Sequence, residues 1–140
     1  MSSVRIEGIT RRYPEGGGVS DFTCEIRDGE FFALLGPSGC GKTTTLRLIA
    51  GLEAPDAGRI LFDGRDVTGV PPEKRNAAMV FQNYALFPHL NVFDNVAFGL
   101  RARKMPRIEI AARVAEALGY VQLEDMARRH VTDLSGGQQQ

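Results

Sequence analysis

The chain has 140 residues, of which 17 are Lys or Arg and 17 are Asp or Glu, so it carries no formal net charge. This balance argues against the basic surface that nucleic-acid binding requires, and we expect no nucleic-acid partner. No stretch approaches the roughly 18 apolar residues of a membrane-spanning helix, and the N-terminus lacks the apolar core of a signal peptide, so we predict a cytoplasmic protein.

The N-terminal region carries strand patterns. Residues 4–9 alternate between apolar and polar side chains, and 19–26 form a second such segment after a glycine loop at 16–18. The apolar run 31–35 stops abruptly at Gly36, which is typical of a strand buried on both faces of a parallel sheet. These patterns predict a hairpin followed by a central strand.

One helix and further strands are predicted next. Residues 42–50 carry apolar side chains at helical spacing, and Gly51 suits the C-terminal cap. Residues 59–62 predict a strand that ends at a hairpin-type turn, 63–64. The apolar segment 78–81 predicts another short buried strand.

The remaining patterns are helical. Asn91 can cap a helix over 92–100, and Pro106 can open a second helix that ends at Gly119. A shorter helical stretch is expected near 123–129. The whole layout indicates an α/β protein with an inserted helical segment.

A phosphate-binding motif follows the run 31–35. Residues 36–43 read Gly-Pro-Ser-Gly-Cys-Gly-Lys-Thr and match the P-loop pattern G-x-x-x-x-G-K-[ST]. Backbone N–H groups of such a loop surround a phosphate, and the positive end of the following helix adds to the attraction. Lys42 should reach the β- and γ-phosphates of ATP, and the Thr43 hydroxyl should bind Mg²⁺. A chance glycine-rich turn is the alternative, which the flanking strand and helix patterns disfavour. The expected nucleotide-binding residues are Gly36, Pro37, Ser38, Gly39, Cys40 (through its backbone only), Gly41, Lys42, Thr43 and Thr44.

A second glycine motif lies far downstream, where residues 134–138 read Leu-Ser-Gly-Gly-Gln. Together with the P-loop, it resembles the signature of the ATP-binding cassette (ABC) transporter ATPases. The resemblance covers essentially the whole chain. It implies that two ATP-binding subunits pair head to tail, and that the signature contacts the γ-phosphate of ATP on the partner subunit. The residues concerned are Leu134, Ser135, Gly136, Gly137 and Gln138.

Two single residues gain a role from the same resemblance. Tyr13, in the segment 11–14, is similar to the family's aromatic residue that stacks on adenine. Its alternative is a strand tyrosine packed on the core. Gln82 follows the run 79–81 as the family's Q-loop glutamine does, which implies contact with Mg²⁺ or the attacking water. Lys42 and Gln82 are therefore the expected catalytic residues.

Residues 83–90 and 95–100 resemble one branch of the family, whose members import polyamines, sugars, ferric iron or sulfate. In that branch this region forms a helical subdomain that faces the membrane subunits. Phe87 and Leu90 either line a groove for a helix of the permease or belong to the core of the subdomain, and the sequence leaves both possibilities open.

The resemblance also implies a domain plan. We expect an N-terminal antiparallel β-subdomain together with part of the P-loop NTPase core over 1–82, a helical subdomain over 83–134 and the signature at 134–140. The family's Walker B aspartate, catalytic glutamate and switch histidine follow the signature, and these 140 residues hold no substitute. We therefore expect an N-terminal fragment, incomplete at its C-terminus, that binds ATP weakly and does not hydrolyse it.

The predicted function is that of an ATP-binding subunit that energises solute transport, using ATP and Mg²⁺. Its implied partners are a second ATP-binding subunit, membrane permease subunits and, indirectly, a solute-binding protein, which places it on the inner face of the cell membrane. A soluble ABC-type ATPase without a permease and a truncated module that binds nucleotide without turnover are the alternatives. A P-loop kinase is disfavoured by the signature at 134–138.

Overall fold

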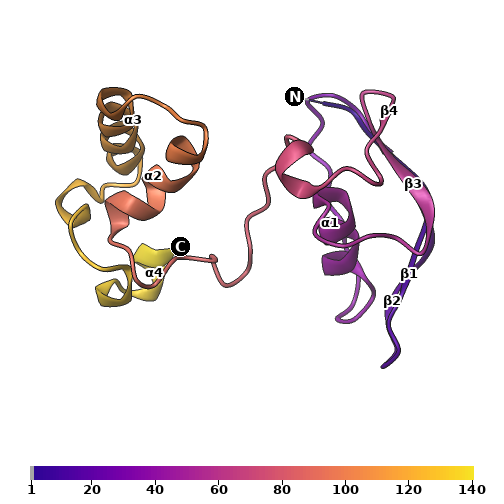
Figure 1. Ribbon diagram of the computed structural model, residues 1–140. Helices are drawn as coiled ribbons and strands as arrows, with labels where there is room; N and C mark the ends of the chain where they lie inside the picture. Colours follow the sequence, from indigo (N-terminus) through magenta and orange to yellow (C-terminus); the bar gives the residue numbers. More distant parts are fainter. Residues whose placement is uncertain (1) are drawn as a thin grey trace. The chain divides into compact units, whose positions relative to one another are not determined.

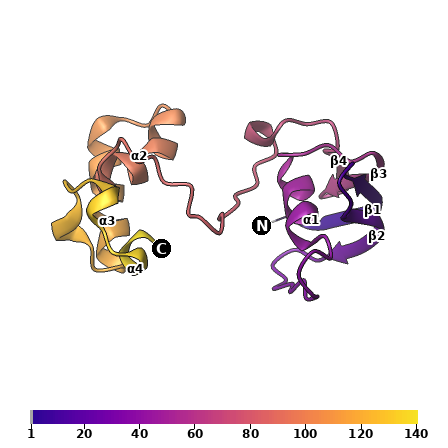
Figure 2. The same cartoon turned by 90° about the horizontal axis from the view of Figure 1, so that it is seen from below.

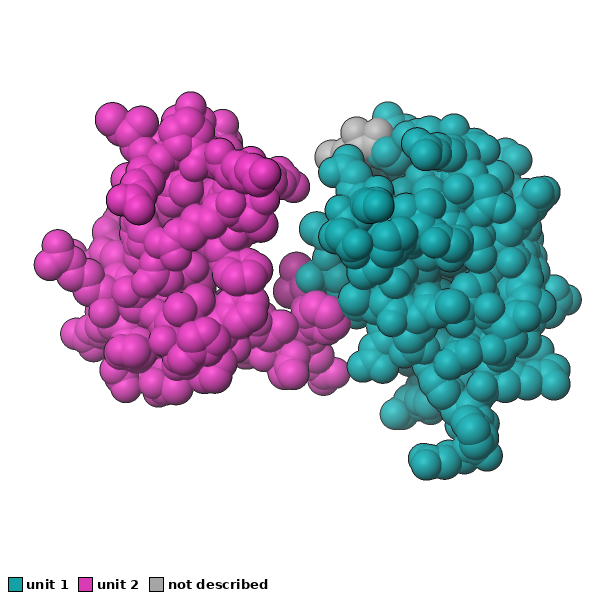
Figure 3. All heavy atoms as spheres, viewed as in Figure 1, with its two compact units in different colours: residues 1–79 teal, residues 80–140 magenta. Residues whose placement is uncertain are grey.

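The computed structural model describes residues 2–140 and divides the chain into two compact units, residues 1–79 and 80–140 (Figure 3). Each unit has a hydrophobic cluster of its own. The three-part division expected from the sequence stays a prediction.

Unit 1 is built on a four-stranded antiparallel sheet with the order β2-β1-β3-β4 (Figure 1). The strands are β1 (Val4–Arg12), β2 (Gly18–Ile26), β3 (Ala57–Phe62) and β4 (Arg65–Asp66). Ile6 in the central strand lies opposite Cys24 on one side and Ile60 on the other. The predicted turn at 63–64 is confirmed, and both its residues have the positive φ angles that a tight hairpin needs.

One helix covers one face of this sheet. Helix α1 (Lys42–Ala50) lies beside the strands in both views (Figures 1 and 2) and has the predicted bounds. Leu48 packs into a cluster with Ile6, Ile9 and Ile60, all fully buried. Gly51 caps the helix at φ 78°, a left-handed conformation that glycine adopts without steric cost, as predicted.

A buried arginine ties the end of α1 to the segment that follows the sheet. Arg75 is only 4% exposed, and burial lowers the pKa of its guanidinium. Its guanidinium donates to the carbonyl oxygens of Leu48 at 2.7 Å, Ile49 at 3.1 Å, Thr68 at 2.8 Å and Val70 at 2.7 Å. A positive charge at the C-terminal end of a helix is also favourable for the helix dipole.

Two predicted strands are wrong. Residues 31–35 and 78–81 adopt no regular structure, and Phe31 (95%), Leu35 (88%) and Val80 (91%) are highly exposed. A strand buried on both faces needs a paired strand on each side, and no strand within residues 2–140 pairs with either segment. The apolar runs therefore lack the hydrogen-bonded neighbours that would turn their pattern into strands.

Unit 2 is helical. Its elements are α2 (Val92–Ala102), α3 (Arg107–Tyr120), α4 (Gly136–Gln139) and the short 3₁₀ turns Glu124–Met126 and Val131–Asp133. The Asn91 side chain caps α2 by accepting from the Asp94 N–H at 2.7 Å, as predicted. Helix α3 begins after Pro106 and continues one residue past Gly119, while the stretch 123–129 contains only a 3₁₀ turn.

The core of unit 2 lies between α2, α3 and the segment before the signature. Its buried members are Val92, Ala97, Ile110, Val114, Leu118, Val131 and Leu134. Within residues 2–140, every helix falls short of the length and apolar character needed to cross a bilayer.

We predict that Arg75→Met destabilises unit 1. Methionine matches the aliphatic stem of arginine but leaves four buried or partly buried carbonyl groups without their donor, which should lower the free energy of unfolding by about 2–3 kcal/mol. Urea unfolding followed by circular dichroism measures the change. The matched control is Arg65→Met, because Arg65 is exposed and its loss should change stability little. Equal effects of the two substitutions would contradict the role given to Arg75.

Candidate nucleotide-binding site

The P-loop begins at Gly36 and leads directly into α1. Gly39 and Gly41 have φ angles of 81° and 90°, in the left-handed region that favours glycine. A Cβ atom at Gly41 would lie 2.4 Å from the carbonyl oxygen of Gly18, so no other residue fits there unless the backbone shifts. The first residue of β2, directly after the turn of the β1–β2 hairpin, therefore lies against the N-cap residue of α1.

Lys42 closes the loop. Its Nζ atom donates to the carbonyl oxygens of Gly36 and Pro37, both at 2.7 Å, and lies 3.5 Å from Cys40 Sγ. The ammonium group thus sits over the loop, next to the backbone that a phosphate would contact. Anionic phosphate oxygens are stronger acceptors for an ammonium than neutral carbonyls, so the same side chain can turn to a nucleotide.

Three hydroxyl-bearing residues follow one another at the start of α1. Thr43 is exposed, Thr44 is buried, and the Thr45 hydroxyl donates to the Gly41 carbonyl at 3.0 Å. Mg²⁺ at phosphate sites is commonly held by one or two protein oxygens together with substrate phosphates. The exposed Thr43 hydroxyl, at the last position of the P-loop and in the first turn of α1, fits that requirement, whereas the Thr44 side chain is buried.

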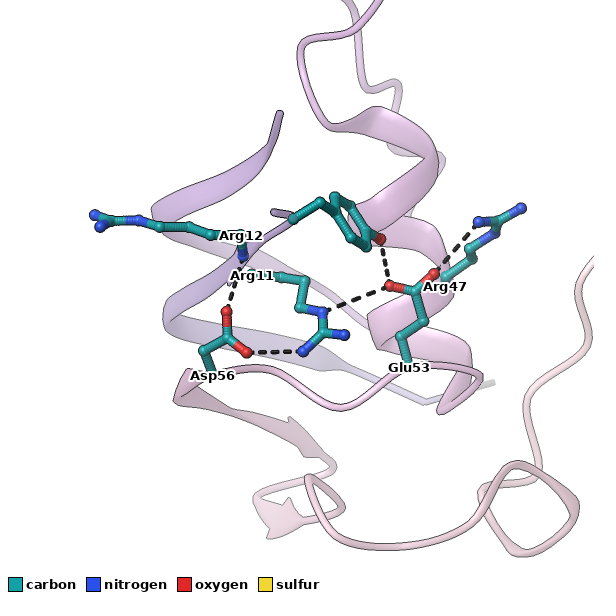
Figure 4. Close-up of polar contacts among 6 residues, drawn as sticks. Arg11, Arg12, Arg47, Glu53 and Asp56 are labelled. Atoms are coloured by element: carbon teal, nitrogen blue, oxygen red, sulfur yellow. Dashed lines mark hydrogen bonds and ion pairs between the residues drawn. The ribbon is translucent and has the colours of Figure 1, made fainter. Parts of the chain in front are cut away.

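Tyr13 lies just beyond the end of β1 and belongs to a polar network (Figure 4). Its hydroxyl donates to Glu53 Oε2, and the Arg11 guanidinium carbon lies 5.5 Å from the centre of its ring. Glu53 also accepts from Arg47 Nη1 at 3.3 Å, while Arg11 Nη1 pairs with Asp56 at 2.7 Å. Tyr13 is therefore held at its hydroxyl and over one face of its ring.

The charges in this network influence one another. The Arg12 backbone N–H donates to Asp56 at 2.8 Å, and this bond, followed by the Arg11 side chain, lowers the pKa of Asp56. The hydrogen bond to Asp56 in turn raises the pKa of Arg11. No local sequence pattern marks Glu53, Arg47 or Asp56. Glu53 and Asp56 contact the end of β1 across 40 to 45 residues, and Arg47 joins the network only through Glu53.

The other predicted site residues belong to unit 2. Gln82 is exposed in an irregular segment. In the signature, Leu134 is buried in the core of that unit, and Ser135 caps α4. Ser135 N donates to Gln138 Oε1 at 2.9 Å, which completes a reciprocal capping box. Gly136 and Gly137 are exposed.

Phe87 also lies in unit 2. Its ring centre is 4.4 Å from that of Phe98, whose side chain is half exposed. The Asn95 amide accepts from the Phe87 N–H at 2.8 Å and donates to the carbonyl of Asn91 at 2.9 Å, which fixes the turn before α2. Phe87 and Leu90 are each partly buried, which is compatible both with a groove for a permease helix and with a place in the core of the subdomain.

The chain is similar to proteins of known family. An ABC transporter family model matches residues 19–140. The chain is 58% identical over 137 residues to the spermidine/putrescine import ATP-binding protein PotA of Aggregatibacter actinomycetemcomitans, a match that covers 98% of this chain and 37% of the relative. It is 63% identical over 141 residues to the protein of the same name from Acidothermus cellulolyticus, with the same coverage. The chain thus spans about 37% of the length of these relatives.

We predict that Gly41→Ala damages this site. Alanine at φ 90° is strained, and its Cβ would clash with the Gly18 carbonyl, so unfolding free energy should fall by about 1–3 kcal/mol. Urea unfolding measures the loss. Gly69→Ala is the control, because a Cβ there meets nothing within 4 Å. A Gly41→Ala protein as stable as Gly69→Ala would refute the close approach to the hairpin.

We also predict an acid-dependent contribution from Asp56. Because its pKa is lowered in the folded state, its stabilising effect is complete above the ordinary Asp pKa of about 3.9 and is lost as pH falls through the folded value. Unfolding free energy, measured by urea titration at a series of pH values below about 5, should fall less steeply in Asp56→Asn than in the wild type. Parallel curves for the two proteins would contradict this assignment.

Proposed function

The chain belongs to the ABC transporter family, and on that premise we propose that it is the ATP-binding part of a subunit that energises solute import by binding and hydrolysing ATP. The observation that carries this proposal is the P-loop of residues 36–43, built onto the N-terminus of α1. Two contacts support the proposal: the hairpin lies close against Gly41, and Lys42 Nζ donates to the Gly36 carbonyl oxygen at 2.7 Å.

In the proposed complex, the backbone N–H groups of the loop and of the first turn of α1 bind the phosphates of ATP. Lys42 exchanges the carbonyls of Gly36 and Pro37 for the β- and γ-phosphate oxygens, where its charge stabilises the negative charge of the transferred group. The Thr43 hydroxyl holds Mg²⁺, which neutralises phosphate charge when bound. Tyr13 stacks on the adenine ring.

Two further roles in this proposal belong to residues of unit 2. Gln82 contacts Mg²⁺ or the attacking water through its amide. The signature, with Ser135 as its exposed hydroxyl, binds the γ-phosphate of ATP held by a second ATP-binding subunit. In α4 the Ser135 hydroxyl accepts from the Gln138 N–H at 3.4 Å, a long contact that an approaching phosphate could displace.

The solute and the partners are proposed from the relatives. Both are named as ATP-binding proteins for spermidine and putrescine import, which supports a polyamine as the transported solute. We propose that the subunit works on the inner face of the membrane with permease subunits, and indirectly with a solute-binding protein. Phe98, whose side chain is half exposed, and the partly buried Phe87 ring beside it offer aromatic surface of unit 2 to such a permease.

We predict that Lys42→Ala weakens MgATP binding by about 10- to 100-fold, because it removes a charge-assisted contact to the phosphates. Isothermal titration calorimetry with the 140-residue chain measures the affinity. Lys74→Ala is the control, since Lys74 lies in the 3₁₀ turn Pro72–Lys74, away from the P-loop in sequence, and is exposed. Undiminished binding in Lys42→Ala would overturn the proposed site.

The expectation that these residues bind ATP without turnover stays a prediction, and phosphate release by the same protein tests it.

A further inference from the structure

We propose that Glu53 is a positioning residue that orients the Tyr13 ring for stacking on the nucleotide base. The proposal deepens the function given above and rests on it, because it assumes that Tyr13 contacts the base. Glu53 would influence the nucleotide only through the Tyr13 side chain. This role accounts for a carboxylate that lies between Arg11 and Arg47 at the end of α1.

Glu53 is well placed to hold a side chain still. Its own side chain is only 19% exposed, and its two oxygens have separate partners. Oε2 accepts the Tyr13 hydroxyl and lies 3.9 Å from Arg11 Nε, while Oε1 accepts from Arg47 Nη1 at 3.3 Å (Figure 4). A carboxylate bound on both sides cannot rotate without breaking one of these contacts.

The backbone around Glu53 links it to α1. Gly51 caps that helix in a left-handed conformation, and the Leu52 N–H donates to the Arg47 carbonyl at 2.9 Å, so the chain turns back on the last turn of α1. Arg47, one of the two arginines on the carboxylate, is itself a residue of α1. The Tyr13 hydroxyl is therefore linked, through Glu53 and Arg47, to the helix whose first two residues end the P-loop.

Arg11 restricts the Tyr13 ring at a second place, one of its two faces. Its guanidinium lies 5.5 Å from the centre of the Tyr13 ring, within the range of a cation–π contact, and is held there by Asp56 at 2.7 Å. The base then stacks on the ring face opposite Arg11. With its hydroxyl and one face both fixed, the ring has little rotamer freedom left to lose when a base binds.

The geometry thus predicts that loss of the Glu53 carboxylate weakens binding of the nucleotide base and leaves binding of the phosphates unchanged. A freely rotating tyrosine can still stack, but ordering it reduces the affinity gained from stacking. Tripolyphosphate, which carries the three phosphates of ATP without ribose or base, should be insensitive to Glu53. The quantity to measure is therefore the Kd for tripolyphosphate divided by the Kd for ATP. A loss of overall stability would weaken binding of both ligands and leave this ratio unchanged.

The experiment compares MgATP and magnesium tripolyphosphate binding to the 140-residue chain by calorimetry. We expect Glu53→Ala to lower the ratio by about 3- to 10-fold, with tripolyphosphate affinity unchanged. Tyr13→Phe, which removes only the hydroxyl, should lower it similarly, and the double variant should lower it no further. Glu53→Gln keeps an acceptor for the hydroxyl and should restore part of the ratio. The control is Glu25→Ala, which removes a carboxylate paired with Arg5 at 3.2 Å on the same sheet.

The outcomes separate the two proposals. If the wild type binds neither ligand, the proposed function fails and the positioning role fails with it. If the wild type binds ATP more tightly than tripolyphosphate but Glu53→Ala leaves the ratio unchanged, the positioning role alone is overturned. Additive losses in the double variant would also overturn it, because Glu53 would then act by a route other than the Tyr13 hydroxyl.

Discussion

The close approach of Gly41 to the carbonyl oxygen of Gly18 is the constraint on which the rest of unit 1 depends. With 2.4 Å between that oxygen and any Cβ, only a glycine lets the start of α1 lie on the turn of the β1–β2 hairpin. The contact joins two segments that local sequence patterns describe separately. It also places the P-loop beside the first residue of β2, which pairs with Arg12 at the end of β1, next to Tyr13, so the two predicted nucleotide contacts share one support.

The opposite end of α1 is held by charged side chains. Arg75 binds the carbonyls of Leu48 and Ile49, and the Arg47–Glu53 pair ties the following turn to the end of β1. A helix of nine residues has little stability alone, and most of it must come from packing and from such contacts. Because both ends of α1 are held, the backbone N–H groups of its first turn keep a fixed orientation, as binding of a phosphate group requires.

Local features of this fold could be predicted from the sequence, and long-range ones could not. The bounds of α1 and the Asn91 cap follow from spacing and from residue chemistry within one turn of helix. The strands expected at 31–35 and 78–81 were wrong because a buried strand depends on distant neighbours, and no strand within residues 2–140 supplies them. The link from Arg75 to the end of α1 could not be predicted for the same reason, since Leu48 and Ile49 are 27 and 26 residues away.

The central claim is that residues 36–43 form a phosphate cradle with α1. Amide nuclear magnetic resonance of the ¹⁵N-labelled chain tests it most directly, by following each backbone N–H as MgATP is added. We predict that the largest chemical-shift changes fall on the amides of Gly39, Gly41, Lys42 and Thr43, with smaller changes at the hairpin turn near Gly18. Saturable shifts confined to other parts of the chain, or no shifts in this loop at millimolar MgATP, would contradict it.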